Sequence, residues 1–279
     1  MSVTPNVNNA KCKIRPPVKW HGGDSYTGPW IIDQFPLHRI YVEPFGGAAS
    51  VLLNKPFVEV EVYNDLDERI TRLFRVLRDH GEELQRRLQL TPYSELEFDA
   101  AAAYPDGASD IEKARLDYVR WRQSHGGQGQ SLSATTSRAR GGKAGDVNAW
   151  WTSIDQLPQI IERLRRVQIM CRPAVEIIKK IDNPEAVIYC DPPYPHSTQS
   201  SGSRNIYAHE MSDDDHRELA VVLRSCRAAV VLAGYPCDLY DRELYPDWRR
   251  VVRPVANHAA GGKEKRKMED VLWIREATP

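Results

Sequence analysis

Four consecutive residues in the second half of the chain have the types and spacing to act on an amino group. Asp191-Pro-Pro-Tyr194 directly follows the apolar run Ala186-Val-Ile-Tyr-Cys190. Two prolines fix φ and remove backbone donors, so the turn after this predicted strand is expected to be rigid. The Asp191 carboxylate and the Pro192 carbonyl can then both accept hydrogen bonds from one NH2 group, and Tyr194 offers a stacking face. The alternative is a rigid surface turn with a strand-capping aspartate.

A glycine-rich turn, Glu43-Pro-Phe-Gly-Gly47, is the second candidate and follows the β-rich run 39–43. Glycines at the carboxyl end of a parallel strand let the backbone approach a ligand closely, at the edge where open α/β sheets bind ligands. Asp65 ends the next predicted strand, where a carboxylate can accept hydrogen bonds from ribose hydroxyls. A plain strand-to-helix turn and a helix N-cap are the respective alternatives. The turn lacks the GxGxxG spacing of nicotinamide and flavin enzymes.

The elements that must position these residues alternate between strand and helix. This order predicts a doubly wound α/β sheet. The expected strands are residues 39–43, 58–63, 186–190, 228–233 and 270–274. One expected helix begins at Ser50. The others include residues 70–77, 111–124, 157–167 and 213–226, the last with Ser212 as its N-cap.

The pattern changes between about residues 79 and 147. Residues 125–143 are rich in glycine, serine and arginine, have no periodicity, and form a connection that is long for a compact domain. We therefore expect residues 14–78 and 151–279 to form a catalytic domain, residues 79–150 to form an insert, and residues 1–13 to be a disordered lead-in. From Lys113 to Lys143 seven basic residues accompany one acid, and such a local patch attracts a polyanion although the net charge is zero.

Composition excludes several classes of protein. No run of about 18 apolar residues is present, which argues against a membrane span. The five cysteines are scattered without a CxxC pair, and the eight histidines show no paired-ligand spacing. We therefore expect no metal site and no disulfide framework, and a reduced, cytoplasmic compartment.

The order of these motifs resembles the Dam-like, D12 class adenine-N6 DNA methyltransferases, including their phage and prophage members. The likeness runs from about Val18 to Ile274 and is carried mainly by Lys19-Trp-His-Gly-Gly23, Tyr41-Val-Glu-Pro-Phe-Gly-Gly-Ala-Ala-Ser50, Asn64-Asp65 and Asp191-Pro-Pro-Tyr194. The resemblance implies a Rossmann-like, S-adenosylmethionine-dependent methyltransferase fold with an inserted, mainly helical and loop-containing target-recognition region. It also implies site-specific methylation of adenine N6 in double-stranded DNA, with base flipping.

The resemblance assigns roles to residues of this sequence. The methyl-donor site would include Trp20, Gly22, Gly23, Glu43, Pro44, Phe45, Gly46, Gly47, Ala48, Ser50, Asp65 and Asp191. Asp65 would take the ribose hydroxyls of the donor. The catalytic residues would be Asp191, Pro192, Pro193 and Tyr194, with Asp191 and the Pro192 carbonyl accepting the hydrogens of N6 and Tyr194 stacking on the base.

Contacts with DNA are expected from the insert and from a basic cluster near the C-terminus. The candidates are Arg120, Arg122, Gln123, Gln128, Gln130, Arg138, Arg140, Lys143, Lys263 and Lys265. Arginine on guanine and glutamine on adenine are the geometrically favoured pairs, and Arg122 or Arg138 is our hypothesis for sequence specificity. The alternative for each residue singly is a solvated surface side chain.

One departure from the family pattern leaves the activity open. Members usually have GGK where this chain has Gly22-Gly23-Asp24, so a lysine is replaced by an acid. A DNA- or donor-binding homologue with impaired catalysis is therefore one alternative. Methylation of another exocyclic amine, cytosine N4 or an RNA base, is the other. A solitary methyltransferase and the partner of a restriction nuclease share the same sequence features.

Overall fold

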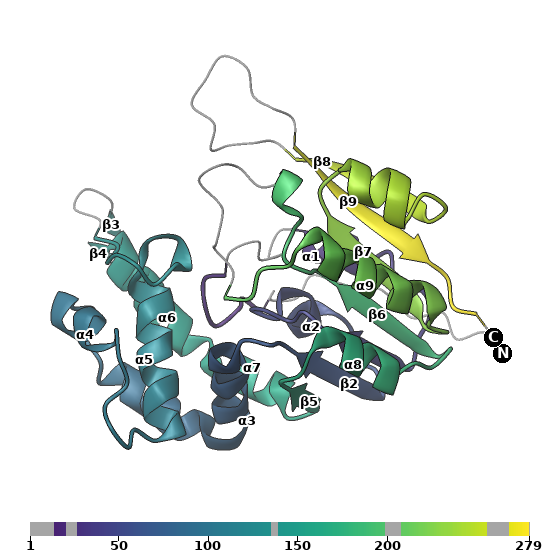
Figure 1. Cartoon of the computed structure of the whole chain (residues 1–279). Helices are drawn as coiled ribbons and strands as arrows, with labels where there is room; N and C mark the ends of the chain where they lie inside the picture. Colours follow the sequence, from purple (N-terminus) through teal and green to yellow (C-terminus); the bar gives the residue numbers. More distant parts are fainter. Residues whose placement is uncertain (1–13, 21–26, 135–138, 199–207, 256–267, 279) are drawn as a thin grey trace, which may run out of the picture.

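The computed structural model describes residues 14–20, 27–134, 139–198, 208–255 and 268–278 (Figure 1). Its main feature is a seven-stranded sheet with the order β5-β2-β1-β6-β7-β9-β8. The strands are β1 (Ile40–Glu43), β2 (Val60–Asn64), β5 (Val167–Met170), β6 (Ala186–Cys190), β7 (Ala229–Gly234), β8 (Arg249–Val255) and β9 (Met268–Arg275). Strand β9 runs antiparallel to both of its neighbours, whereas the pairs from β5 to β7 are parallel. This doubly wound α/β architecture confirms the predicted fold class.

Alternate side chains of the central strands enter two separate cores. Tyr41 and Tyr63 pack on one face of the sheet, whereas Val42 and Val62 pack on the other. All five residues of β6 are buried, because a central parallel strand is covered on both faces. The apolar run before Asp191 is therefore continuous rather than alternating.

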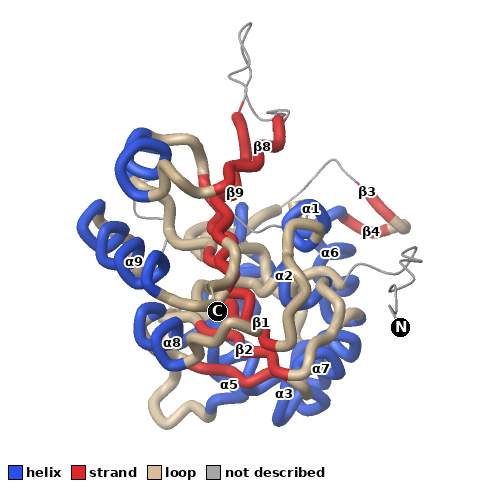
Figure 2. Tube along the Cα trace, turned by 90° about the vertical axis from the view of Figure 1, so that its right-hand side faces the viewer, coloured by secondary structure: helices blue, strands red, loops and turns tan. Residues whose placement is uncertain are grey.

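Helices cover both faces of the sheet (Figure 2). On one face lie α1 (Gly28–Ile32), α2 (Ser50–Asn54), α3 (Glu68–Gln89) and α7 (Leu157–Leu164). On the other lie α8 (Ala174–Lys180), α9 (Asp213–Ser225) and the short π-helical turn η3 (Leu239–Leu244). The predicted N-cap of α9 is confirmed, since Ser212 and Asp215 form a capping box.

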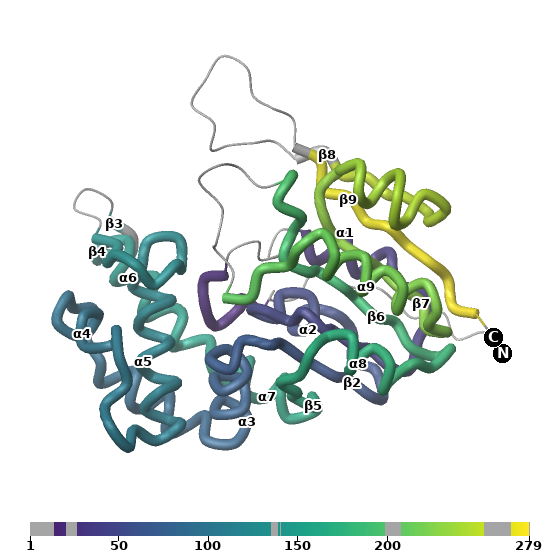
Figure 3. The backbone as a smooth tube through the Cα atoms, viewed as in Figure 1, coloured from purple at the N-terminus to yellow at the C-terminus, as the bar shows by residue number. Residues whose placement is uncertain are grey.

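The insert gathers at one end of the molecule (Figure 3). It contains α4 (Glu95–Ala100), α5 (Asp110–Gln123), η1 (His125–Gly127), the short hairpin β3 (Ala139–Arg140) and β4 (Lys143–Ala144), and α6 (Gly145–Asp155). Tyr118 and Trp150 pack edge to face with ring centroids 5.7 Å apart, inside a core that continues to the sheet. Both expected domain boundaries fall inside helices, in α3 and α6, although the α3 backbone leaves helical geometry at His80. The division into catalytic and target-recognition parts stays a prediction.

Two strands of the seven-stranded sheet, β5 and β8, were missed from the sequence, as was the short hairpin of β3 and β4. The predicted helix 157–167 ends at Leu164, and Val167 instead begins β5. Val167 continues the spacing of three and four residues, and four residues are too few for an alternating pattern to outweigh it. Edge strand β8 contains Arg249, Arg250 and Arg253, so its sequence does not have the apolar enrichment of a buried strand.

A buried ionic cluster joins α2, β2 and α7. The Glu61 carboxylate accepts hydrogen bonds from Lys55 Nζ at 2.7 Å and Arg163 Nη2 at 2.9 Å, and all three side chains are at most 2% exposed. Arg163 also donates to the carbonyl of Leu52 at 2.7 Å. The cluster therefore fixes α2, which follows the glycine turn, against its neighbours.

Replacing the acid of this cluster should destabilise the protein strongly. In Glu61→Ala two buried cations lose their partner, and we expect the free energy of unfolding to fall by about 3–5 kcal/mol. The matched control is Glu59→Ala, which removes an exposed partner of Arg39 and should change stability little. Urea unfolding measures both, and equal effects would contradict a structural role for the cluster.

Candidate active site

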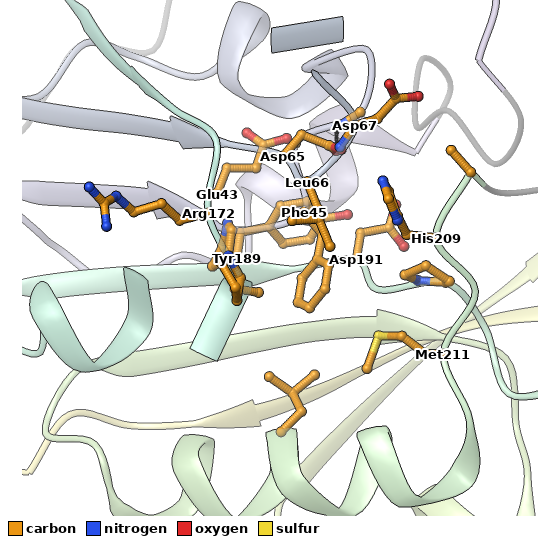
Figure 4. Close-up of a pocket in the computed structure, with 18 of the residues that line it drawn as sticks. Glu43, Phe45, Asp65, Leu66, Asp67, Arg172, Tyr189, Asp191, His209 and Met211 are labelled. Carbon is orange, nitrogen blue, oxygen red and sulfur yellow. Dashed lines mark hydrogen bonds between the residues drawn. The ribbon is translucent and has the colours of Figure 1, made fainter. Parts of the chain in front are cut away.

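A cavity of about 330 Å³ lies at the carboxyl ends of β1, β2, β5 and β6 (Figure 4). Strand β1 lies between β2 and β6, so the cavity is located where the chain changes from building one half of the sheet to building the other. Ligands of open α/β folds bind at such a switch point. Its volume falls within the ~300–1,000 Å³ of small-molecule pockets.

The first wall is the glycine turn after β1, and its glycines are required by their surroundings. A Cβ on Gly46 would lie 2.2 Å from Cε2 of Tyr63. Gly47 has φ +45°, and a Cβ there would lie 2.6 Å from Nε1 of Trp20. The turn thus presents bare backbone to the cavity, with the Trp20 indole beside it. Trp20 and every predicted donor-site residue from Glu43 to Ser50 line the cavity.

Asn64, which is fully buried, ties three strand ends together. Its Nδ2 donates to the carbonyls of Pro44 at 2.8 Å and Arg172 at 2.9 Å. Its Oδ1 accepts from the backbone N–H of Arg172 at 3.0 Å. The loops after β1 and β5 therefore take their positions from the last residue of β2.

The next residue, Asp65, holds the glycine turn with its carboxylate. One oxygen accepts from the N–H of Gly47 at 2.8 Å and the other from the N–H of Asp67 at 2.8 Å. The N-cap of α3 is Asp67, not Asp65, so the N-cap alternative for Asp65 was wrong. A carboxylate has about four acceptor sites, which leaves Asp65 able to accept ligand hydroxyls as well.

Burial raises the pKa of Asp65 to about 6, against the opposing effect of its two backbone hydrogen bonds. Glu43 is also buried, and its carboxylate accepts from the Tyr41 hydroxyl at 2.9 Å and the Leu52 N–H at 3.1 Å. These bonds hold the start of α2 against β1. Glu43 is thus a positioning residue as well as part of the cavity wall.

The Asp-Pro-Pro-Tyr turn forms the facing wall. Asp191 and Pro193 line the cavity together with Tyr189 from β6, while Pro192 is buried. Tyr194 does not line the cavity; its ring packs edge-on against Tyr235, with centroids 4.8 Å apart. The fold thus brings Asp191 into the same cavity as Asp65, 126 positions earlier in the sequence.

A third wall was missed from the sequence. It is formed after β5, by the segment before α9 and by α9 itself, and includes Arg172, Pro173, Val175, His209, Met211, Asp215, Glu218 and Leu219. Recognising β5 would have indicated Arg172, since that residue follows a parallel strand at the ligand-binding edge. With this wall included, the described residues that line the cavity contribute seven carboxyl groups and one arginine.

A family model described as D12 class N6 adenine-specific DNA methyltransferase matches residues 20–121 and 133–251. The chain belongs to this family. The match confirms the resemblance and indicates adenine in DNA as the substrate. None of the curated protein sequences matches the chain significantly. The matched residues of this D12 methyltransferase include all the described residues that line the cavity, whereas residues 122–132 of the insert lie between the two matched stretches.

Two residues predicted to contact DNA instead form hydrogen bonds within the insert of this D12 methyltransferase. Gln123 is fully buried, donating to the carbonyl of Pro92 at 3.1 Å and accepting from the Ser94 N–H at 3.3 Å, which contradicts its predicted contact with DNA. Arg120 donates to the carbonyl of Phe98 at 3.1 Å and to that of Gly129, and it stacks 4.0 Å from the Phe98 ring. Arg120 therefore holds the loop after α5.

The other predicted DNA contacts of the D12 methyltransferase differ in exposure. Gln128, Gln130 and Lys143 are exposed, whereas Arg122 is half-buried between α5 and α6. Gly22, Gly23, Asp24, Arg138, Lys263 and Lys265 lie outside the described residues, as does the side chain of Arg140.

The described part of the chain contains no helix with the length and apolarity of a membrane span. Within the same residues, no three His, Cys, Asp or Glu side chains gather closely enough to hold a metal ion.

The raised pKa of Asp65 predicts a pH dependence of stability. The folded state binds this proton more tightly than the unfolded state, whose value is near 3.8. The contribution of protonated Asp65 to the free energy of unfolding is therefore present below about pH 4. It is lost as the pH rises through about 6, by on the order of 3 kcal/mol. Asp65→Asn lacks it. Urea unfolding at pH 4–7 should give a difference between wild type and variant that falls with pH, and a constant difference would contradict the assigned pKa.

Proposed function

We propose that this D12 methyltransferase transfers a methyl group from S-adenosylmethionine to N6 of adenine in double-stranded DNA, at a base flipped into the cavity beside Asp191. The observation that carries the proposal is that Asp65 and Asp191 line one cavity at the switch point of the sheet. One end of the cavity suits a nucleoside donor, and the other suits an amino acceptor.

The donor end fits S-adenosylmethionine in shape and charge. Gly46 and Gly47 allow the turn to pack directly against Tyr63 and Trp20, where a Cβ would collide, and Asp65 is placed to accept ribose hydroxyls. The seven carboxyl groups among the described lining residues favour a ligand that carries a sulfonium and an ammonium. When bound, S-adenosylmethionine supplies an electrophilic methyl group on positively charged sulfur.

At the acceptor end, the Asp191 carboxylate and the Pro192 carbonyl would accept hydrogen bonds from one amino group. The lone pair of adenine N6 is delocalised into the ring, which makes this nitrogen a poor nucleophile. Hydrogen bonds from N6 to Asp191 and to the Pro192 carbonyl return electron density to the nitrogen as it gains the methyl group and loses a proton. Rigid placement of these acceptors by β6 and two prolines supplies positioning and preorganised electrostatics.

The base must leave the duplex before it can reach Asp191. Unstacking costs a few kcal/mol, and stacking on an aromatic side chain returns ~1–3 kcal/mol per base. Tyr194 is suited to this role because Tyr235 contacts it edge-on and supports the ring. The exposed Gln128, Gln130 and Lys143 are the described candidates for contacts with the surrounding DNA.

Isotope transfer followed by digestion of the DNA to nucleosides tests the proposal. Wild type should place labelled methyl groups in N6-methyladenine, and Asp191→Ala should lose at least 100-fold in rate because the acceptor of the N6 hydrogen is gone. Asp24→Lys restores the lysine usual at that position, and activity found only in this variant would identify a catalytically impaired homologue. Label in N4-methylcytosine or only in RNA would replace adenine in DNA by another substrate.

The glycine turn allows a test of donor binding alone. Gly47→Ala adds a methyl group at positive φ against the Trp20 indole, and we expect the affinity for S-adenosylmethionine to fall at least tenfold. The control is Gly28→Ala, whose added Cβ would have Ser50 O, at 3.9 Å, as its nearest neighbour. Isothermal titration calorimetry measures both, with thermal melts to establish folding. Unchanged affinity in Gly47→Ala would remove this turn from the donor site.

A further inference from the structure

A second, smaller cavity lies between the N-terminal segment and the insert, apart from the candidate active site. Its volume is about 180 Å³, below the ~300 Å³ expected of a pocket for a drug-sized ligand. Residues of the N-terminal segment, the end of α5, and α6 with the residue after it line the cavity: Arg15, Pro16, Arg122, Gly145, Asn148, Ala149, Thr152, Ser153 and Gln156. Polar groups and two arginines dominate this wall.

The two arginines face a cavity whose described lining contains no carboxylate. Arg122 Nη2 donates to the Ala149 carbonyl at 3.1 Å, while its Nε is buried with no hydrogen-bond partner among the described residues. Burial lowers the pKa of Arg122 and Arg15 adds to the effect, although Tyr118 opposes it. A half-buried guanidinium beside a second cation is unfavourable, and a bound anion would remove the imbalance.

The donors left at this cavity suit an oxyanion. The two hydroxyls are not among them, because each already donates to a backbone carbonyl: Thr152 to that of Asn148 at 2.8 Å and Ser153 to that of Trp150 at 2.6 Å. The donor that remains is the backbone N–H at Gly145, the first residue of the 11-residue helix α6. The N–H groups of a first helical turn have no intrahelical partner. Together with the Asn148 amide and two guanidinium groups, these N–H groups could surround a single phosphate.

The backbone that carries the exposed Arg15 is held in place at two points. Asn54 Nδ2 donates to the carbonyl of Ile14 at 2.9 Å, and Lys19 Nζ donates to that of Ser124 at 3.1 Å. The segment that carries Arg15 is thus fixed at one end to α2 and at the other to the end of α5. Figure 1 shows this segment, in purple, passing between the sheet and the insert.

We propose that this cavity binds one phosphate of the DNA backbone, so that Arg122 contacts phosphate rather than a base edge. The inference rests on the proposed action on DNA. Phosphate contacts set the position of a protein on the duplex without reading sequence. Because the segment of Arg15 leads to Trp20 in the donor cavity, a phosphate held here fixes the duplex relative to that cavity.

The salt dependence of duplex binding tests the phosphate contact. We expect Arg122→Gln and Arg15→Gln each to lower the slope of log K against log[salt] by about one, with the same fold loss of affinity on every duplex sequence. The control Arg165→Gln removes an exposed arginine paired with Glu162, and it should leave the slope unchanged. A loss confined to particular sequences in Arg122→Gln would overturn the proposal in favour of base recognition.

Single methylphosphonate substitutions along the duplex locate the contact. Wild type should lose affinity at one phosphate position at which Arg15→Gln and Arg122→Gln show no further loss, since each variant has already lost that interaction. Additive losses at every position would overturn the assignment. Thermal melts provide a second measurement: inorganic phosphate should raise the Tm of wild type more than that of Arg15→Gln, and equal shifts would count against the site.

Methyl transfer by wild type, measured alongside, separates the two proposals. Transfer with unchanged salt slopes in both arginine variants overturns the phosphate site alone. Altered slopes without any transfer overturn the proposed function alone and leave the phosphate site standing.

Discussion

The hydrogen bonds of Asn64 and Asp65 are the constraint on which the candidate active site depends. Two adjacent side chains at the end of β2 bind the turn after β1 on one side and, through Asn64, the loop after β5 on the other. These loops could otherwise move independently, because parallel strands end in separate connections. The buried Asn64 amide makes the position of one loop depend on the others. A ligand that touches both the glycine turn and Asp65 therefore meets a preformed surface.

The facing wall is rigid for a different reason. Asp191 follows a strand buried on both faces, and two prolines restrict the backbone after it. Since β1 and β6 are hydrogen-bonded neighbours, the glycine turn and Asp191 are separated only by the spacing between adjacent strands. The sheet thus brings the glycine turn with Asp65 and the turn that begins at Asp191 into one cavity, although the residues are far apart in the chain. Chemistry between a bound donor and a bound base needs this proximity.

Sequence patterns predicted the parts of the site in which a short motif directly follows a strong strand. Strand 186–190, the glycine turn and Asp65 are of this kind, because buried β-rich runs and glycine or proline turns are local signals. Arg172 and His209 carry no such signal: one follows a four-residue strand that continues a helical spacing, and the other precedes α9 in a connection. Their places depend on packing that spans the whole chain.

The insert shows a second limit of sequence patterns. A cluster of arginine and glutamine residues predicted contacts with DNA, but residue type does not separate a DNA contact from an internal hydrogen bond. Gln123 satisfies backbone groups of Pro92 and Ser94, and Arg120 does the same for Phe98. Both lie on α5 beside Arg122, which reaches a cavity instead. One helical turn therefore separates residues with quite different roles, and only the tertiary structure distinguishes them.

The most direct test of the central claim is a crystal structure with S-adenosylhomocysteine, the demethylated form of the donor. We expect the ribose hydroxyls to lie within hydrogen-bond distance of the Asp65 carboxylate, beside the glycine turn. The sulfur should then point toward Asp191. A ligand bound outside this cavity, or bound with its sulfur turned away from Asp191, would contradict the account.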